Sequence, residues 1–574
     1  MHISNPEHTI NKRLNRLYPP EIAQKAVNSI IDLIFKYKSR VDSKEYKLSQ
    51  KDVILITYGN QVTRESEPSL QTLKEFMDKH LKGIINSIHI LPFYPYSSDD
   101  GFSVVNYNTV DPHMGSWREI EQISADYRLM VDGVINHVSQ FSDWFKAYLE
   151  NDEYFKDFFI EVDPSVDLRK VVRPRSTPLL SEFLDANGRV KNIWTTFSRD
   201  QVDLNYKSHR VLRNVLDSLF YYIEKGARII RLDAIAFIWK EIGTTCVHLP
   251  QTHELIQLIR EVLHEVAPEV IIITETNVPH DENVSYFGSG DDEAQMVYNF
   301  ALPPLLIHSI LNADTQKLTS WAKTLTLPSD KVCFFNFTAS HDGIGLRPVH
   351  DILSKEEIEN LVSTIKEHKG LVSYRMDENG VESPYELNCS YIDALTHPNE
   401  DSNIRLKRML VAQATALVMP GVPGIYFHSL VGSRNYHDGV KHSGQNRTIN
   451  REKLNIDWLE TKLAKQGSSV KTMFDSYKRL ISIRISEKAF DPFGSFRFLD
   501  LGSKLFALEQ TCKECEQRVL AIHNFSNERV NCVIPEDISL PLYDILSSNF
   551  TVTIKDNKEI YIEPYQMVWL KGNV

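Results

Sequence analysis

Four short motifs of this 574-residue chain place carboxylate and imidazole side chains directly after apolar runs. A single motif of this kind is most often structural, for example an ion pair that closes a strand. Four of them in series, each at the end of a run, instead predict one shared site with three carboxylates and two histidines. In chain order they are Asp132-Gly-Val-Ile-Asn136-His137, Arg231-Leu-Asp233-Ala, Ile273-Thr-Glu275 and Ser340-His341-Asp342-Gly.

Asp233 and Glu275 follow consecutive runs and are the candidates for a catalytic pair. Two carboxylates that flank a bond suit glycosidic chemistry, because one captures an oxocarbenium-like centre while the other protonates the departing oxygen. A separation of about 5–5.5 Å would indicate double displacement through a covalent intermediate. Arg231 lies two residues before Asp233 on the same strand face, where its charge would keep Asp233 ionised. Desolvation after a buried run would raise the pKa of Glu275, as a general acid requires.

The elements that position these motifs follow a regular rhythm. Eight short apolar, β-branched runs alternate with amphipathic segments, such as 211–225 and 253–266, or with long polar stretches. Buried parallel strands are continuous apolar runs, so this count predicts an α/β fold, a parallel (β/α)₈ TIM barrel. The active sites of such barrels lie at the C-terminal ends of the strands, which adds Asp99 and Phe102, after the second run, to the site. The runs are 53–58, 88–93, 129–136, 227–233, 270–275, 297–301, 332–337 and 424–427.

Four further regions flank or interrupt the barrel pattern. Residues 1–50 predict a helical N-terminal extension with an apolar stripe. The barrel, over residues 51–484, is expected to hold two inserted loop domains, at about 140–205 after the third strand and at about 343–400 after the seventh, because proline-containing or polar stretches break the rhythm there. Short strand-like runs with turn residues over 485–574 predict a C-terminal antiparallel β domain.

The composition limits the classes of protein to which the chain can belong. With 42% hydrophobic and 24% charged residues it is a globular protein. A formal net charge of −12 disfavours nucleic acid and anionic membranes as partners, and no run approaches the ~18 apolar residues of a membrane span. Six cysteines without a framework spacing predict a reducing, cytoplasmic location. Cys512 and Cys515 have half of a zinc-ribbon spacing, and an exposed hairpin tip is the favoured interpretation.

The motifs together resemble those of a known family from about residue 53 onward. DGVINH, RLDA, ITET and SHDG are similar to the four ordered strand-end motifs of the α-amylase superfamily, glycoside hydrolase family 13. Three further segments are typical of its sucrose phosphorylase-like group of α-glucoside phosphorylases: Tyr96-Ser-Ser-Asp-Asp-Gly-Phe102, Arg173-Pro-Arg175 and Pro420-Gly-Val-Pro423.

The resemblance implies a role for each matching residue. Asp233 would be the nucleophile, Glu275 the acid/base and Asp342 the carboxylate that clamps the distorted glucosyl ring. Arg175 and Tyr385 match positions that receive inorganic phosphate. The remaining residues would hydrogen-bond the glucose hydroxyls or, in the case of Phe102, stack on the sugar: Asp99, Phe102, His137, His341 and Arg447. No cofactor is implied, and no metal-ligand set is assigned, because only Asn136 of an amylase-type calcium site is recognisable.

One departure bears on the acceptor. Sucrose phosphorylases usually carry a histidine two residues after the acid/base, where this chain has Asn277. Asn277, the helical N-terminal extension and the segment Gly432-Ser-Arg434-Asn are more similar to glucosylglycerate phosphorylases, whose acceptor is glycerate. A guanidinium from Arg434 beside Arg175 would suit a carboxylate, because its planar fork binds one bidentately. The alternative for Arg434 is a surface ion pair on a loop.

Two other classes of function stay open at this point. The same catalytic apparatus could act on sucrose or glucosylglycerol, or transfer glucose to water as a hydrolase does. A non-catalytic amylase-like binding module is the more remote alternative, because it would retain a costly trio of buried carboxylates without using them.

Overall fold

The computed structural model describes residues 6–43, 46–376, 382–515, 517–538, 541–547 and 558–572. Within these ranges the chain forms a closed barrel of eight parallel strands in the order β1-β16-β12-β11-β10-β9-β4-β3. Each strand coincides with one of the eight apolar runs, so the predicted (β/α)₈ barrel is confirmed. The strands are β1 (Ile54–Thr57), β3 (Ser87–Ile90), β4 (Arg128–Gly133), β9 (Ala227–Leu232), β10 (Ile271–Thr274), β11 (Met296–Tyr298), β12 (Cys333–Phe337) and β16 (Val422–Tyr426).

The barrel closes between β1 and β16, where Ile54 pairs with Gly424. Glycine is required at position 424 because a Cβ there would lie 2.3 Å from the Phe335 ring, which fills the space beside it. The barrel strands are almost entirely buried, as expected for parallel strands that are covered on both faces. Side-chain packing therefore fixes the strand ends, where the chemistry-bearing motifs begin.

Amphipathic helices surround the barrel. Helix α6 (His209–Glu224), for example, buries Val211, Leu212, Val215 and Leu219 at helical spacing. A capping box of Ser116 and Glu119 starts the helix that follows β3. The other covering helices are α3 (Ser69–His80), α4 (Trp117–Asp126), α7 (Pro250–Val266), α8 (His280–Val284), α9 (Leu302–Asn312), α10 (Gln316–Ala322), α13 (Ser402–Val418), α14 (Phe427–Val431), α15 (His437–Ser443), α16 (Ile456–Ala464) and α17 (Ser469–Ser486).

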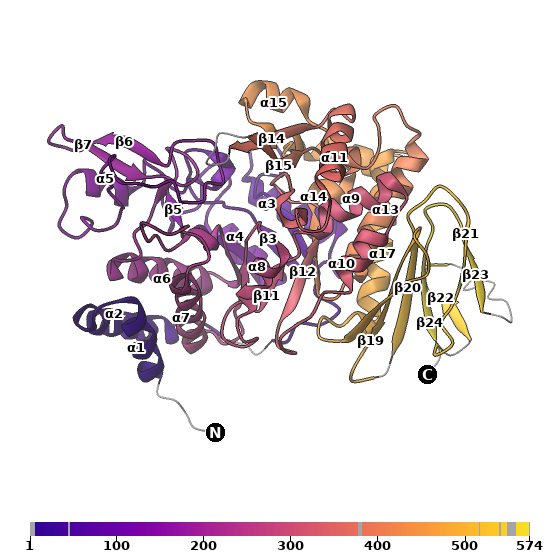
Figure 1. Cartoon of the computed structure of the whole chain (residues 1–574), viewed down its shortest axis with the longest axis horizontal. Helices are drawn as coiled ribbons and strands as arrows, with labels where there is room; N and C mark the ends of the chain where they lie inside the picture. Colours follow the sequence, from indigo (N-terminus) through magenta and orange to yellow (C-terminus); the bar gives the residue numbers. More distant parts are fainter. Residues whose placement is uncertain are drawn as a thin grey trace.

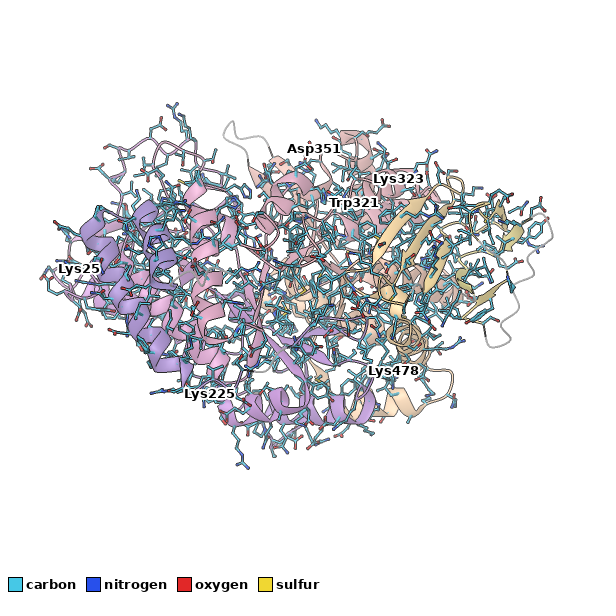
Figure 2. All side chains as sticks on the ribbon, turned by 90° about the horizontal axis from the view of Figure 1, so that it is seen from below. Lys25, Lys225, Trp321, Lys323, Asp351 and Lys478 are labelled. Carbon is cyan, nitrogen blue, oxygen red and sulfur yellow. The ribbon has the colours of Figure 1, made fainter. Side chains whose placement is uncertain are left out.

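Two N-terminal helices, α1 (Pro6–Leu17) and α2 (Pro20–Lys38), form an extra layer over α6 and α7. The Tyr37 ring stacks on Phe220 at 5.2 Å, and Arg13 Nε lies 2.8 Å from Glu261 Oε2. Figures 1 and 2 place this layer at one end of the molecule and the C-terminal strands at the other. The layer covers barrel helices on the side of the molecule away from the C-terminal strands.

Two insertions rise from the barrel. The first, between β4 and β9, contains β5 (His137–Val138), α5 (Asp143–Leu149), β6 (Leu180–Leu184), β7 (Val190–Trp194) and β8 (Val202–Asp203). The second, between β12 and β16, contains β13 (Ile344–Gly345), α11 (Lys355–Glu367), β14 (Leu371–Met376), β15 (Glu382–Asn388) and α12 (Tyr391–Ala394).

A buried ammonium group fastens the first insertion to the barrel. Nζ of Lys240 lies 2.7 Å from Asn136 Oδ1, after β4, and 2.6 Å from Asp203 Oδ2 in β8. The remaining oxygen of Asp203 accepts the N–H of Thr196. Asn136 is the one recognisable ligand of an amylase-type calcium site. Its side-chain oxygen and those of Asp203 already have protein donors as partners.

Antiparallel strands form the C-terminal part. A five-stranded sheet has the order β18-β19-β20-β24-β22, and β21 pairs with β23 beside it. Cys512 and Cys515 lie at the hairpin between β19 and β20, Cys512 buried and Cys515 exposed.

We propose domain boundaries near residues 50 and 484, between α2 and β1 and before β18. The strands are β18 (Ser495–Leu499), β19 (Leu505–Thr511), β20 (Arg518–Asn524), β21 (Val530–Val533), β22 (Leu542–Asp544), β23 (Glu559–Ile562) and β24 (Met567–Gly572). None of the helices in the described ranges is long and apolar enough to cross a membrane.

Candidate active site

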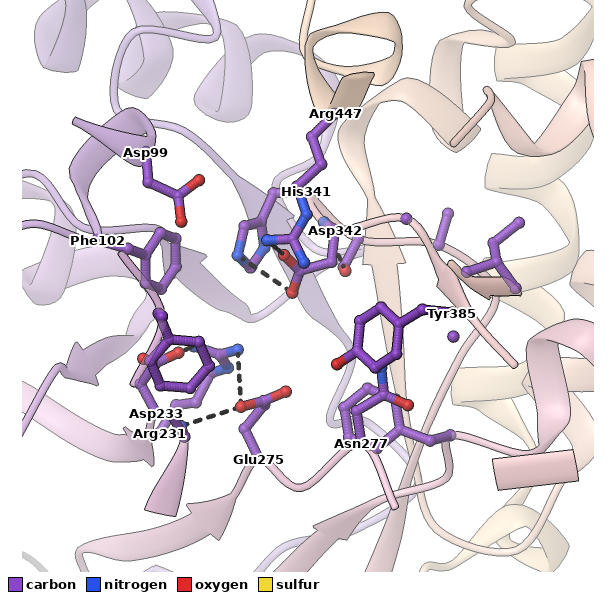
Figure 3. Close-up of a pocket in the computed structure, with 18 of the residues that line it drawn as sticks. Asp99, Phe102, Arg231, Asp233, Glu275, Asn277, His341, Asp342, Tyr385 and Arg447 are labelled. Atoms are coloured by element: carbon purple, nitrogen blue, oxygen red, sulfur yellow. Dashed lines mark hydrogen bonds and ion pairs between the residues drawn. The ribbon is translucent and has the colours of Figure 1, made fainter. Parts of the chain in front are cut away.

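One cavity at the C-terminal ends of the barrel strands collects twelve of the thirteen residues that the sequence predicts for the site. Figure 3 shows Asn277 and Tyr385 across the cavity from Asp99 and Phe102. The twelve lining residues are Asp99, Phe102, His137, Arg175, Arg231, Asp233, Glu275, Asn277, His341, Asp342, Tyr385 and Arg447. An outer cavity adjoins it, and Asp99, Arg175 and Arg447 line both.

Adjacent strands hold Asp233 and Glu275 at the same level. Leu232 in β9 pairs with Thr274 in β10, so the next residue of each strand enters the cavity. The chain then turns sharply at Ala234, whose φ of 49° is left-handed. This turn directs the N–H of Ala234 to Oε2 of Glu275 at 3.0 Å. The two carboxylates are therefore held by one strand pair and one backbone turn.

Arg231 is shared between two acidic residues. Its Nη1 atom lies 2.7 Å from Asp233 Oδ1 and 2.5 Å from Oδ1 of the fully buried Asp132. Asp132 is in turn held by His89 Nε2 at 2.7 Å. Arg231 is thus placed beside Asp233, and it is shared with Asp132.

Burial has the largest effect on the pKa values of Asp233 and Glu275, the candidate catalytic pair. Burial raises the pKa of Asp233 and that of Glu275 to about 7, and Arg231 opposes this rise in both cases. Arg231 donates a hydrogen bond to Asp233 but lies 3.9 Å from Glu275, so a proton shared by the pair resides on Glu275. Burial also acts to raise the pKa of Asp342, but Arg447 and neighbouring cations lower it below its ordinary value. Burial therefore favours a protonated Glu275, whereas the cations around Asp342 favour its ionised form.

A strained turn presents the next residues. Asp99, Asp100 and Gly101 all have positive φ, and a Cβ at position 101 would lie 2.6 Å from the backbone oxygen of Pro92. Arg451 holds the turn through Asp100 Oδ2 at 2.9 Å. The side chain of Asp99 is left to line the cavity.

Phe102 and the two histidines form a packed wall. The Phe102 ring stacks on His341 with 4.6 Å between centroids and 2° between planes. His137 Nε2 lies 2.9 Å from the backbone oxygen of Phe102 and 3.3 Å from Gln201 Nε2. A sugar hydroxyl that bonds to Nε2 of His137 would therefore have to replace one of these two contacts.

Tyr385 and Asn277 line the side of the cavity opposite Asp99, and Arg175 lines the cavity as well. The guanidinium of Arg175 lies over the Tyr385 ring at 5.9 Å, and Figure 3 shows the Tyr385 hydroxyl directed toward Glu275. Asn277 Oδ1 is buried without a hydrogen-bond partner among the described residues. Glycine at position 345 allows this approach, since a Cβ there would lie 2.4 Å from Asn277 Oδ1.

Arg434 is the predicted site residue that the structure places elsewhere. It does not line the cavity; its Nε donates to Oδ1 of the buried Asp393, and 42% of its side chain is exposed. Asp393 also accepts the backbone N–H of Asn435. The expected position beside Arg175 is therefore wrong. The physical reason is that the buried carboxylate of Asp393 requires a cationic partner, and the guanidinium of Arg434 provides it.

Several residues of the site escape the sequence motifs. Gln201 and Phe197 come from the first insertion and line the cavity, whereas Glu386 comes from the second and lines the outer cavity. No periodic pattern marks these loop residues. Asp132 was within reach of sequence reasoning, because it opens the DGVINH motif on the same strand as Asn136 and His137.

A (β/α)₈ barrel that carries an insertion after its third strand, and presents three carboxylates in one cavity after its fourth, fifth and seventh strands, defines an α-amylase-type carbohydrate-active protein. Comparison with known proteins agrees with this class. The protein-family model for the α-amylase catalytic domain matches residues 75–344 of this chain.

Full-length relatives place the chain more narrowly. A glucosylglycerate phosphorylase of Spirochaeta thermophila is 43% identical, over 98% of each chain, and one of Allomeiothermus silvanus is 48% identical over 79% of this chain and 81% of its own. The crystal structure of sucrose 6F-phosphate phosphorylase from Thermoanaerobacter thermosaccharolyticum, 24% identical over 83% of this chain and 94% of its own, shares the fold with a TM-score of 0.72. This chain belongs to the α-amylase superfamily, glycoside hydrolase family 13, in the sucrose phosphorylase-like group together with the glucosylglycerate phosphorylases.

Proposed function

We propose that this chain is a retaining α-glucoside phosphorylase that transfers glucosyl from 2-O-α-glucosylglycerate to inorganic phosphate. The products are α-glucose 1-phosphate and D-glycerate. The observation that carries this proposal is the presence, in one cavity, of three carboxylates and the guanidinium of Arg175. The relatives support it, because two proteins that are 41–43% identical over more than 90% of this chain are glucosylglycerate phosphorylases.

In the first half of the reaction, Asp233 is the nucleophile. A carboxylate oxygen of Asp233 bonds to the anomeric carbon as the bond from that carbon to the glycerate oxygen breaks. Glu275 donates its proton to the departing oxygen, consistent with a pKa raised by burial to about 7. Asp342, kept ionised by Arg447 at 2.5 Å, holds the distorted sugar ring.

In the second half, phosphate takes the place of glycerate. A phosphate oxygen attacks the anomeric carbon, its proton passes to Glu275, and the bond to Asp233 breaks, which restores both carboxyl groups to their starting states. The anion is held at Arg175 and Tyr385. Glycerate leaves before phosphate enters, so one guanidinium serves both anions in turn.

The acceptor preference rests on Arg175 and Asn277. Since Arg434 lies outside the cavity, Arg175 is the partner that we assign to the glycerate carboxylate, through a charge-assisted and bidentate contact. Asn277 Oδ1, which has no partner among the described residues, can accept a hydroxyl of the acceptor. Glycerol and fructose lack the carboxylate and would forgo the first contact.

The test follows product formation from 2-O-α-glucosylglycerate and, in parallel, from sucrose, with and without phosphate. We expect phosphate-dependent release of α-glucose 1-phosphate from the first donor and much slower release from sucrose, with Asp233→Asn as the inactive control. Glucose release that does not depend on phosphate would identify a hydrolase. A preference for sucrose would identify a sucrose phosphorylase.

A further inference from the structure

Glu386, in β15, is a buried carboxylate that lies at the junction of the two cavities but outside the catalytic one. It is 1% exposed and lines the outer cavity. Its Oε1 atom accepts the backbone N–H of Gly343 and lies 3.0 Å from Nε of Arg447. Its Oε2 atom lies 3.8 Å from Nη1 of Arg175. One carboxylate thus contacts a residue of the glucose site and the residue assigned to the anion.

These contacts complete a row of alternating charges: Asp342, Arg447, Glu386 and Arg175. Arg447 is engaged on both sides, with Nη1 at 2.5 Å from Asp342 Oδ1 and Nε on Glu386. Arg175 has Glu386 as its acidic neighbour within 4 Å among the described residues, and 29% of its side chain is exposed. Arg175 therefore has capacity for a further anion, whereas Arg447 does not.

The backbone next to Asp342 is adapted to this arrangement. A Cβ at position 343 would lie 2.4 Å from Cγ of Glu386 and 2.7 Å from its Cδ. Any other residue would push the carboxylate away from Arg447. The glycine of the SHDG motif thus makes room for a side chain that comes from the second insertion.

We propose that Glu386 is a positioning residue that fixes Arg447 by a hydrogen bond and serves as the internal counter-ion of Arg175, so that it sets the affinity of the site for phosphate. The inference rests on the proposed function, because it takes Arg175 as the anion partner.

The two contacts of Glu386 differ in kind, and this makes them separable. Arg447 donates hydrogen bonds from Nε and Nη2 to Oε2 of Glu386, each at 3.3 Å, and its Nε also lies 3.0 Å from Oε1, where the oxygen of a glutamine can remain as an acceptor. At 3.8 Å the contact with Arg175 is an attraction between charges, which glutamine cannot provide. Glu386→Gln therefore removes the negative charge and keeps one oxygen acceptor beside Gly343 and Arg447, whereas Glu386→Ala removes the charge and both acceptors.

The first measurement is the partition of the glucosyl-enzyme between phosphate and water. The enzyme is loaded with α-glucosyl fluoride, and glucose 1-phosphate and glucose are quantified over a range of phosphate concentrations. In Glu386→Gln, the phosphate concentration that gives equal amounts of both products should fall roughly 3- to 10-fold, because an anion next to Arg175 no longer faces a fixed negative charge. An unchanged or higher concentration would overturn the counter-ion role.

The second measurement is kcat/KM for α-glucosyl fluoride, which reports on the glucosylation step. Glu386→Ala should lower it on the order of 10- to 100-fold relative to Glu386→Gln, because only alanine releases Arg447. Equal values for the two variants would overturn the positioning of Arg447. Melting temperatures and circular dichroism show whether each variant is folded.

Two control variants make the assignment specific. In an Arg175→Ala background, Glu386→Gln should shift the phosphate dependence of the partition less than about twofold, because its target is gone. Glu382→Gln removes one exposed charge from the same strand and should shift it as little. If Glu382→Gln shifted the phosphate dependence as much as Glu386→Gln does, the effect would arise from the net charge of the protein, and the proposal would be overturned. Failure of the proposed function looks different, since the unaltered enzyme would then form no glucose 1-phosphate at any phosphate concentration.

Discussion

The backbone N–H of Ala234 donates a 3.0 Å hydrogen bond to Oε2 of Glu275. Ala234 directly follows Asp233, so the candidate acid is held by the residue next to the candidate nucleophile. A displacement of either strand end would change the spacing of both carboxylates.

Asp233→Asn should abolish phosphorolysis, with a loss on the order of 10⁴- to 10⁶-fold, because the covalent step loses its nucleophile. The amide is close in shape to the carboxylate, so the fold should persist. Release of α-glucose 1-phosphate and the melting temperature are the measurements. Near-normal turnover in a folded variant would remove Asp233 from this role.

Glu275→Gln should lose activity on glucosylglycerate but retain part of its glucosylation rate with α-glucosyl fluoride. Fluoride leaves with little protonation, so the ~10²- to 10⁴-fold contribution of a general acid is not needed in that step. The comparison uses kcat/KM for both donors. Losses of equal size on the two donors would contradict the assignment of Glu275 as the acid.

The pH dependence of kcat/KM for glucosylglycerate should be bell-shaped with a maximum near neutrality. The first step needs Glu275 protonated and Asp233 ionised, and burial raises the pKa of both groups to about 7. Above that pH the acid is lost, and below it the nucleophile is protonated. With α-glucosyl fluoride the decline at high pH should disappear. An identical decline with both donors would place the titration on another group.

Lys240→Met should destabilise the protein by about 3–5 kcal/mol, because it leaves the buried carboxylate of Asp203 without its charge partner. Urea denaturation at pH 7 measures the change in the free energy of unfolding. The double variant Lys240→Met/Asp203→Asn should recover part of the loss, since it leaves no unpaired charge. A double variant no more stable than the single one would argue that the packing of Lys240, and not its charge, fastens the insertion.

Arg175→Ala should depress kcat/KM for D-glycerate, with α-glucose 1-phosphate as donor, on the order of 10- to 100-fold more than kcat/KM for glycerol, because charged hydrogen bonds are lost only with the anion. Arg434→Ala should change the ratio of the two acceptors less than about twofold, since Arg434 pairs with Asp393 outside the cavity. A selective loss of glycerate in Arg434→Ala would return that residue to the acceptor site.

Much of the site follows from local sequence patterns. Runs of β-branched residues mark the barrel strands, and the barrel fold places whatever follows each strand at one end. For this reason the sequence alone predicts that Asp233, Glu275 and Asp342 share one cavity. The same logic placed Asp99 and Phe102, which follow the second strand.

The positions of Arg434 and Glu386 cannot be predicted in this way. Arg434 and Glu386 both lie in segments after barrel strands, yet Arg434 pairs with Asp393 while Glu386 reaches the gap between Arg175 and Arg447. Which charges meet depends on how two insertions fold over the barrel, and these contacts join positions up to about two hundred residues apart. Continuous apolar runs mark where the strands end, so the barrel and its three candidate catalytic carboxylates could be predicted from the sequence. The partners of Arg434 and Glu386 depend on the folded chain, because a buried charge is stabilised by whichever opposite charge the packing brings within reach.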